Sequence, residues 1–208
     1  MSDNKATWCC DTMPVWIKGV EWDFQEVINW FKSEGIYDDI VSRKINIIWT
    51  GGEPTIPGHQ DSIKNFVREW VDIDPKSENV FYEIETNGTL DFETLFPFIN
   101  QINCSPKLSN SGMPKMQRLR PEVIASIMKH ENYQFKFVVS TEDDIFEMFD
   151  TYIEPLNIPL KNVVCMPGLD DRNDFHERTR WVLEMARKYK FRGLTRLHIS
   201  AWNKTTGV

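Results

Sequence analysis

The sequence of 208 residues lacks long hydrophobic runs and blocks of basic residues. No apolar segment approaches the roughly 20 residues that a membrane-spanning helix needs, and residues 1–16 lack the apolar core of a signal peptide. With 24 basic and 31 acidic residues, the net charge of −7 gives no indication of direct nucleic-acid binding. These absences predict a cytoplasmic protein without a membrane interaction.

Cysteine is also scarce. The cysteines are Cys9, Cys10, Cys104 and Cys165. Their spacing is not that of a disulfide framework. Because adjacent thiols suit the chelation of one metal poorly, the first pair is either two ordinary cysteines near the N-terminus or part of a larger motif. The other two lie within apolar segments, which predicts small core residues.

Short β-branched or aromatic segments alternate with longer segments of helical periodicity, and the sequence shows no repeat or low-complexity linker. The predicted strands are 45–50, 79–85, 100–104, 133–140, 161–166 and 195–200. The predicted helices are 23–34, 60–71, 90–98, 121–130, 142–153 and 174–190. This order predicts one α/β domain over residues 1–208, with a parallel sheet that curls toward a barrel or part-barrel. The strands read as nearly continuous apolar runs, which predicts that both sheet faces are covered.

The start of this pattern is unusual, because no predicted strand precedes the helix at 23–34. Either the fold begins atypically or a first strand is absent from this chain. Residues 105–120 are the longest irregular segment, and they are predicted to form a functional loop.

The carboxyl ends of the predicted strands are where an α/β protein binds ligands. The strand at 45–50 ends at Thr50 and is followed by Gly51, Gly52 and Glu53. Two glycines permit positive φ and close approach of a ligand to the main chain, and Glu53 offers a carboxylate for a cation. The alternative is a tight turn without a ligand.

Similar ends follow two further predicted strands. One is Glu85-Thr86-Asn87-Gly88-Thr89, in which Asn87-Gly88 alone is equally typical of an ordinary turn. The other is Ser105-Pro106-Lys107, where the lysine favours contact with an anion. Several such ends on neighbouring strands favour one shared site.

Taken in order, these motifs resemble the 7-carboxy-7-deazaguanine synthase family of radical S-adenosylmethionine enzymes. The matching segments are CDTMPVW, WTGGEPT, ETNGT, SPK, KFVV, MP and LH…AWNK…GV, from about residue 8 to the C-terminus. The resemblance implies a curled parallel sheet, a partial (β/α) barrel of the radical S-adenosylmethionine type, with its first strand missing from this chain.

The resemblance also implies an activity. Members of this family are carbon–nitrogen lyases that convert 6-carboxy-5,6,7,8-tetrahydropterin to 7-carboxy-7-deazaguanine with loss of ammonia, in queuosine and deazapurine biosynthesis. The implied cofactors are a [4Fe–4S] cluster, S-adenosylmethionine and Mg²⁺. The implied partners are the pterin substrate and an electron donor such as flavodoxin, and a homodimer is compatible with the resemblance.

The resemblance assigns roles to individual positions. Cys10 corresponds to a cluster ligand and Thr12 to a magnesium ligand, since a hydroxyl oxygen suits a hard cation. The positions that correspond to S-adenosylmethionine contacts are Asp11, Gly51, Gly52, Glu53, Ser105, Pro106 and Lys107. The positions that correspond to the substrate pocket are Thr50, Glu85 and Asn87.

The sequence departs from the family at the cluster motif, which is Cys-x-x-x-Cys-x-x-Cys before Asp-Thr. With Cys10 as the last cysteine, the other two positions hold Thr7 and Asp3, and Cys9 is out of register. Hydroxyl and carboxylate oxygens are poor replacements for cluster thiolates. The hypotheses are therefore an N-terminally short or divergent synthase, or a non-catalytic homologue that binds a nucleoside or pterin without a cluster. Another radical enzyme, such as an activase, fits CDT and SPK less well.

Overall fold

Six parallel strands form one sheet in the computed structural model, which describes residues 6–8, 19–169, 172–203 and 205. The strands are β1 (Ile47–Trp49), β2 (Tyr82–Thr86), β3 (Gln101–Cys104), β4 (Tyr133–Val139), β5 (Val163–Pro167) and β6 (Arg192–Gly193). Their spatial order follows the chain order, from β1 at one edge to β6 at the other. The all-parallel arrangement confirms the α/β class that alternating strands and helices predicted.

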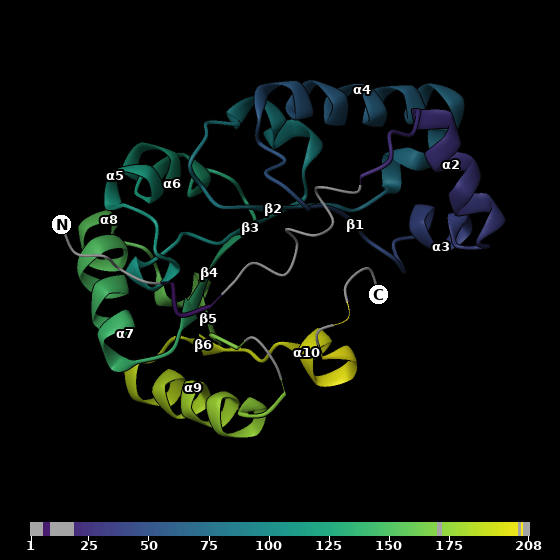
Figure 1. The fold of residues 1–208 in the computed structure, drawn as a ribbon. Coiled ribbons are helices and arrows are strands. Elements are labelled where there is room, and N and C mark those ends of the chain that lie inside the picture. The colour runs from purple at the N-terminus through teal and green to yellow at the C-terminus, as the bar shows by residue number, and fades with distance from the viewer. Residues whose placement is uncertain (1–5, 9–18, 170–171, 204, 206–208) are drawn as a thin grey trace.

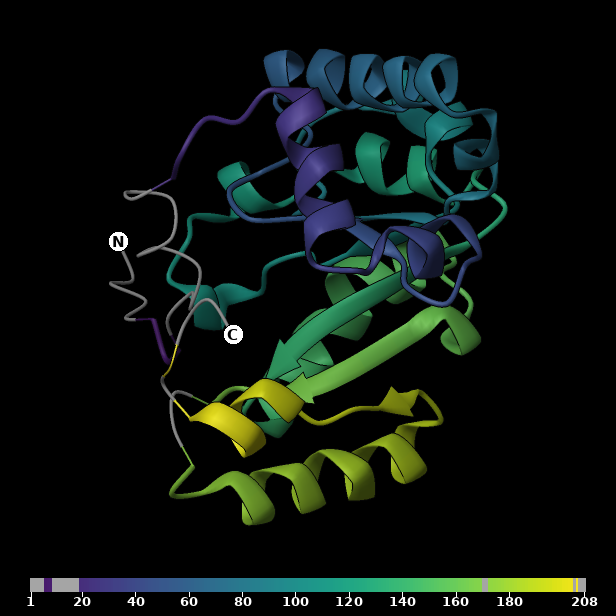
Figure 2. The same ribbon diagram turned by 90° about the vertical axis from the view of Figure 1, so that its right-hand side faces the viewer.

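Helices connect consecutive strands and lie in an arc along one side of the sheet (Figure 1). The α-helices are α2 (Phe24–Ser33), α3 (Tyr37–Val41), α4 (Pro57–Ile73), α5 (Lys115–Arg118), α6 (Pro121–Ile127), α7 (Glu142–Met148), α8 (Glu154–Leu156), α9 (Phe175–Tyr189) and α10 (Leu197–Trp202). Short 3₁₀-helices span Pro75–Asn79, Glu93–Phe98, Ser109–Ser111 and Leu160–Asn162, and a π-helical turn spans Phe149–Ile153. Figure 2 shows α4 and α9 at opposite ends of this helical layer.

Local sequence signals explain where several helices begin. A capping box starts α2, where the Asp23 side chain accepts a hydrogen bond from the N–H of Glu26 and the Glu26 side chain accepts one from the N–H of Asp23. Thr141 and Asp144 form the same arrangement at α7. Pro57 opens α4 at a position where no N–H donor is needed.

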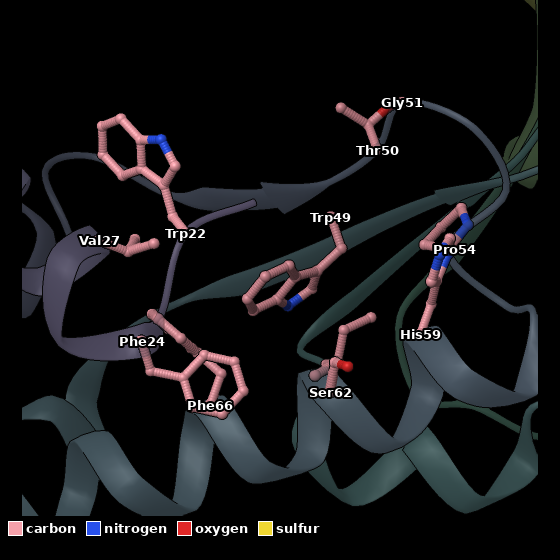
Figure 3. Close-up of a pocket in the computed structure, with 11 residues that line it drawn as sticks. Trp22, Phe24, Val27, Trp49, Thr50, Gly51, Pro54, His59, Ser62 and Phe66 are labelled. Atoms are coloured by element: carbon pink, nitrogen blue, oxygen red, sulfur yellow. The ribbon is translucent and has the colours of Figure 1, made fainter. Parts of the chain in front are cut away.

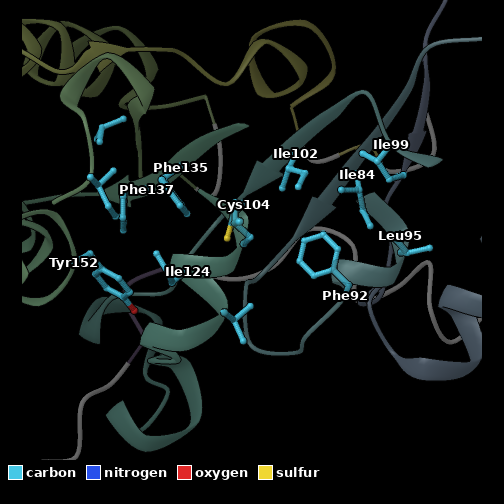
Figure 4. Packing of buried hydrophobic residues seen from close by; sticks show 14 of the residues in the cluster. Ile84, Phe92, Leu95, Ile99, Ile102, Cys104, Ile124, Phe135, Phe137 and Tyr152 are labelled. Atoms are coloured by element: carbon cyan, nitrogen blue, oxygen red, sulfur yellow. The ribbon is translucent and has the colours of Figure 1, made fainter. Parts of the chain in front are cut away.

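The hydrophobic core lies between the sheet and this helical layer. Alternate residues of β2 and β4 are buried on that side, including Ile84, Phe135 and Phe137, which are all fully buried. Figure 4 shows these side chains packed with Cys104 and Tyr152, which come from β3 and the π-helical turn. Complete burial of one large apolar side chain contributes about 1.5–3 kcal/mol, so this face supplies most of the folding free energy.

The other face of the sheet carries polar side chains at the alternate positions. This polar face is formed by Glu83 and Glu85 of β2, Asn103 of β3, and Gln134 and Lys136 of β4. The prediction that both faces would be covered by apolar packing is therefore wrong. In β2, β3 and β4 the apolar residues alternate with polar ones, and only the apolar set faces the helices.

The last predicted strand is a second correction. Residues 195–200 were expected to be extended, but residues 197–202 form α10, and the edge strand β6 is Arg192–Gly193. Leu197 and Ile199 imitate the alternation of a strand. However, Leu197 is 72% exposed, and only Ile199 is buried, against Leu169 and Phe175. The other five predicted strands are confirmed within a few residues.

The helix predictions are mostly confirmed, with differences in detail. The segment predicted at 90–98 is a 3₁₀-helix that contains Pro97, and the one predicted at 142–153 divides into α7 and the π-helical turn. Among the described residues, no strand precedes β1, and no helix is long and apolar enough to cross a membrane.

Candidate functional site

Glu53 joins the loop after β1 to the loop after β2. Its Oε1 atom accepts hydrogen bonds from the hydroxyls of Thr55 and Thr86, each at 2.6 Å. Its Oε2 atom accepts one from the main-chain N–H of Asn87 at 2.9 Å. The carboxylate that the sequence offered as a cation ligand therefore already has a structural role, which is to hold two neighbouring strand ends together.

Gly51 and Gly52, which precede Glu53, leave their main chain uncovered. Both are exposed and have positive φ values of +74° and +62°. A Cβ atom on Gly52 would meet nothing within 4 Å. The backbone conformation requires these glycines, because L-residues rarely adopt it, and the surrounding space permits close approach of a ligand.

The loop after β2 is fixed against the end of β3. The N–H of Ser105 donates to the carbonyl oxygen of Thr86 at 2.7 Å. Gly88 has a φ of +72°, and a Cβ there would lie 2.6 Å from the Sγ of Cys104. Asn87 Oδ1 accepts from the N–H of Thr89 at 2.9 Å, so its side-chain oxygen shapes the turn.

An ion pair that the sequence analysis did not identify fixes the loop after β3. Arg118, only 5% exposed, pairs with Glu147 at 2.6 Å and donates to the carbonyl oxygen of Lys107 at 3.1 Å. Tyr152 donates its hydroxyl to the same carbonyl at 2.9 Å, and burial raises the pKa of Tyr152 to about 12. Pro106 of the same loop is buried. The sequence could not predict this ion pair, because Arg118 is a single arginine in a segment without a periodic pattern.

The three loops form one continuous edge, which we call the loop rim: residues 50–53, 87–89 and 105–107. The first described residues of the chain reach this rim. Thr7 N–H donates to the carbonyl oxygen of Asn110 at 2.9 Å, and Trp8 Nε1 donates to Asn110 Oδ1 at 3.1 Å. The Nζ of Lys107 lies 5.4 Å from the centroid of a Trp8 ring. The predicted ligands Cys10, Asp11 and Thr12 lie outside the described residues.

Glu85 and Lys136 form an ion pair on the polar face, immediately inside the rim. Lys136 Nζ lies 2.7 Å from Glu85 Oε1, and the hydroxyl of Thr50 donates to Glu85 Oε2 at 3.2 Å. The structure therefore brings together the predicted residues Thr50 and Glu85. Lys136 was missed as a site residue, although a lysine alternating with Phe135 and Phe137 is a sign that β4 has one polar face.

A second row of polar contacts crosses the same face farther from the rim. Asn46 and Asn103 donate to the two oxygens of Glu83 at 2.8 and 2.7 Å. Gln134 donates to Asn103 Oδ1 at 2.6 Å and accepts from Arg192 at 3.3 Å. The row runs from the start of β1 to β6, and Asn103 in its middle is 4% exposed.

An apolar pocket of about 310 Å³ lies beside the rim, between α2, the end of β1 and the start of α4 (Figure 3). Aromatic and aliphatic side chains such as Trp22, Phe24 and Phe66 form most of its walls. Thr50 and Gly51 belong to both the pocket and the rim. This lining suits an apolar group rather than a charged one.

Metal-binding groups are absent from the part of the chain that the structure describes: no three His, Cys, Asp or Glu side chains gather there. Cys104 and Cys165 are fully buried, as predicted, and burial raises the pKa of both thiols. Neither is available as a thiolate ligand, because a metal requires the deprotonated sulfur.

Comparison of the sequence with models of known protein families and with curated proteins finds no match.

Proposed function

We propose that this chain is a member of the 7-carboxy-7-deazaguanine synthase family and that its loop rim binds S-adenosylmethionine beside a pterin. The observation that carries the proposal is the convergence of three motif segments, WTGGEPT, ETNGT and SPK, on one edge of the sheet through Glu53 and Ser105. Three independent turns would not need hydrogen bonds that join one loop to the next. The finer fold assignment, a partial (β/α) barrel, belongs to the same proposal.

The rim residues have complementary tasks in this proposal. The exposed main chain of Gly51 and Gly52 binds the amino or carboxylate group of the methionyl part, while Glu53 keeps the loop in place. Ser105 and Lys107 contact the cosubstrate from the neighbouring loop, whereas Pro106 is buried and shapes that loop. Thr50 and Glu85 contact the pterin on the polar face, next to Asn87.

The residues of this chain do not fit a [4Fe–4S] cluster held by three cysteines. Thr7 stands at the position of the middle cysteine, and its N–H is bonded to the carbonyl oxygen of Asn110. The thiols of Cys104 and Cys165 are buried in the core. We therefore derive no step through a cluster. Thr12 supplies a suitable oxygen for Mg²⁺, but it lies outside the described residues.

Thr7 offers a hydroxyl where the family has a cluster thiolate. This difference favours a second candidate function, in which the chain binds the nucleoside or the pterin without performing the lyase reaction. Anaerobic reconstitution with iron and sulfide, followed by iron analysis and measurement of 5′-deoxyadenosine release, separates the two candidates. A loaded protein that releases 5′-deoxyadenosine supports the lyase. An iron-free protein that still binds S-adenosylmethionine supports the second candidate.

Calorimetric titration with S-adenosylmethionine tests the rim itself. Gly52→Val places a β-branched side chain at positive φ and covers the main chain, so we expect affinity to fall at least about tenfold, equivalent to about 1.4 kcal/mol. Gly35→Val is the matched control, because Gly35 has a φ of +71° and open space around it but lies after α2. Equal affinity of the wild type and Gly52→Val would refute the assigned role.

A further inference from the structure

We propose that Asn110 is a positioning residue of the loop rim, which acts by holding Trp8 against Lys107. The inference rests on the proposed function, since Lys107 is one of the rim residues that this function assigns to S-adenosylmethionine. It adds Asn110 and Trp8, to which neither the motifs nor the resemblance gave a role. It also makes ligand affinity depend on one hydrogen bond at the edge of the rim.

Asn110 uses both ends of its side-chain amide. Its Oδ1 atom accepts a hydrogen bond from Trp8 Nε1 at 3.1 Å, and its Nδ2 atom donates one to the carbonyl oxygen of Val138 at 2.9 Å. Its main-chain carbonyl oxygen accepts from the N–H of Thr7 at 2.9 Å. Asn110 is only 7% exposed. The residue is therefore anchored to β4 while it receives two donors from the N-terminal segment.

The loop that carries Asn110 is fixed independently of Trp8. Glu147 accepts hydrogen bonds from the N–H of Ser109 at 3.0 Å and from its hydroxyl at 2.5 Å. The same carboxylate pairs with Arg118, which is 5% exposed. The amide of Asn110 is therefore presented by a preorganised loop, and the partly buried indole of Trp8 binds to it.

Trp8 transmits this anchoring to the rim. The Nζ of Lys107 lies over the Trp8 ring, 5.4 Å from a ring centroid, which is within the range of cation–π attraction. The same Nζ donates to Ser105 Oγ at 3.2 Å. Because a lysine side chain is long and flexible, the indole and the hydroxyl restrict where its ammonium lies. Loss of the hydrogen bond from Trp8 to Asn110 would release the ring and, with it, the ammonium that meets the ligand.

Calorimetric titration of the full chain with S-adenosylmethionine tests this inference. Trp8→Phe keeps an aromatic ring but removes the N–H donor, and Asn110→Ala removes the acceptor. We expect each change to weaken binding about fivefold, as for the loss of one hydrogen bond. The double variant should bind no more weakly than the weaker single variant, because both changes break the same bond. Trp30→Phe is the matched control, since Trp30 is exposed on α2, outside the rim, and should leave affinity unchanged.

Asn110→Asp separates positioning from a purely structural role. The aspartate keeps an acceptor for Trp8 but cannot donate to the carbonyl oxygen of Val138. It should therefore lower the melting temperature at least as much as Asn110→Ala does, and yet bind S-adenosylmethionine more tightly than Asn110→Ala. If the asparagine were only structural, affinity would fall in parallel with the melting temperature.

Three results would overturn the inference alone. They are wild-type affinity in Trp8→Phe or in Asn110→Ala, additive losses in the double variant, and binding by Asn110→Asp as weak as that by Asn110→Ala. The last result would mean that affinity follows the bond to Val138 rather than the one to Trp8. Absence of S-adenosylmethionine binding by the wild type would overturn the proposed function, and the inference with it.

Discussion

The two faces of the sheet contrast in what covers them. The face toward the helices carries fully buried side chains such as Ile84, Phe135 and Phe137. The polar face carries Glu85 and Lys136, which remain partly exposed even though they pair with each other. The same strands thus serve two purposes at alternate positions. The difference indicates that substitutions on the two faces should separate the stability of the protein from its ligand binding.

The largest expected effect concerns the thiols of the covered face. Because burial raises the pKa of Cys104 and Cys165, both should react with iodoacetamide more than about a hundredfold more slowly in the folded than in the unfolded protein at pH 8. Raising the pH from 7 to 8 should accelerate alkylation about eightfold in guanidinium, where thiols ionise near pH 8.5, and about tenfold from the much lower native rate, because a thiol far below its pKa gains tenfold in thiolate per pH unit. Mass spectrometry of the two peptides measures both rates. Rapid native alkylation would contradict the packing of this face.

Phe137→Ala comes next and tests the contribution of the covered face to stability. Removal of a fully buried aromatic side chain should lower the free energy of unfolding by about 3–5 kcal/mol. Val138→Ala is the control on the other side of the same strand, and it should cost less because Val138 is only partly buried. Guanidinium denaturation measures both. Equal losses would remove the distinction between the faces.

Glu53→Gln lies at the boundary between the two faces. A glutamine cannot accept from Asn87 N–H with one end while accepting from Thr55 and Thr86 with the other, so a lost contact should cost about 1–3 kcal/mol. The loosened loops should also bind S-adenosylmethionine more weakly. Denaturation measures the change in stability, and calorimetry measures the change in affinity. A variant with normal stability and affinity would show that the hydrogen bonds of Glu53 are not needed to hold the two loops.

The smallest expected effect on stability belongs to Glu85→Gln. Partly exposed ion pairs contribute about 0–1 kcal/mol, so the loss of the charge opposite Lys136 should change the unfolding free energy by less than about 1 kcal/mol. The contrast with Phe137→Ala is the informative quantity. A loss as large as that of Phe137→Ala would mean that the polar face is a structural core.

The fold could be predicted from the sequence where one signal dominated. Apolar β-branched runs located five strands, and cysteines within them were correctly placed in the core. Alternation misled at 195–200, because a two-residue pattern cannot show that Leu197 lies in solvent. The polar face was missed because the strands were interpreted as nearly continuous apolar runs, although β2 and β4 carry Glu83, Glu85 and Lys136.

The candidate site could be predicted as a set of strand ends but not as a set of contacts. Motif order indicated Thr50, Glu53 and Ser105 together, and the structure joins their loops by hydrogen bonds. The ion pair of Arg118 with Glu147 connects residues 29 positions apart, and no local pattern indicates such a pairing. Glu53 was predicted as a ligand-facing acid, whereas its carboxylate is bonded within the protein.

The most direct test of the central claim is amide hydrogen–deuterium exchange with and without S-adenosylmethionine. If the loop rim is one binding site, amides of residues 50–53, 87–89 and 105–107 should all exchange more slowly when the ligand is present, while α9 should be unchanged. Unchanged exchange in all three segments, or protection confined to a region away from the rim, would contradict the account.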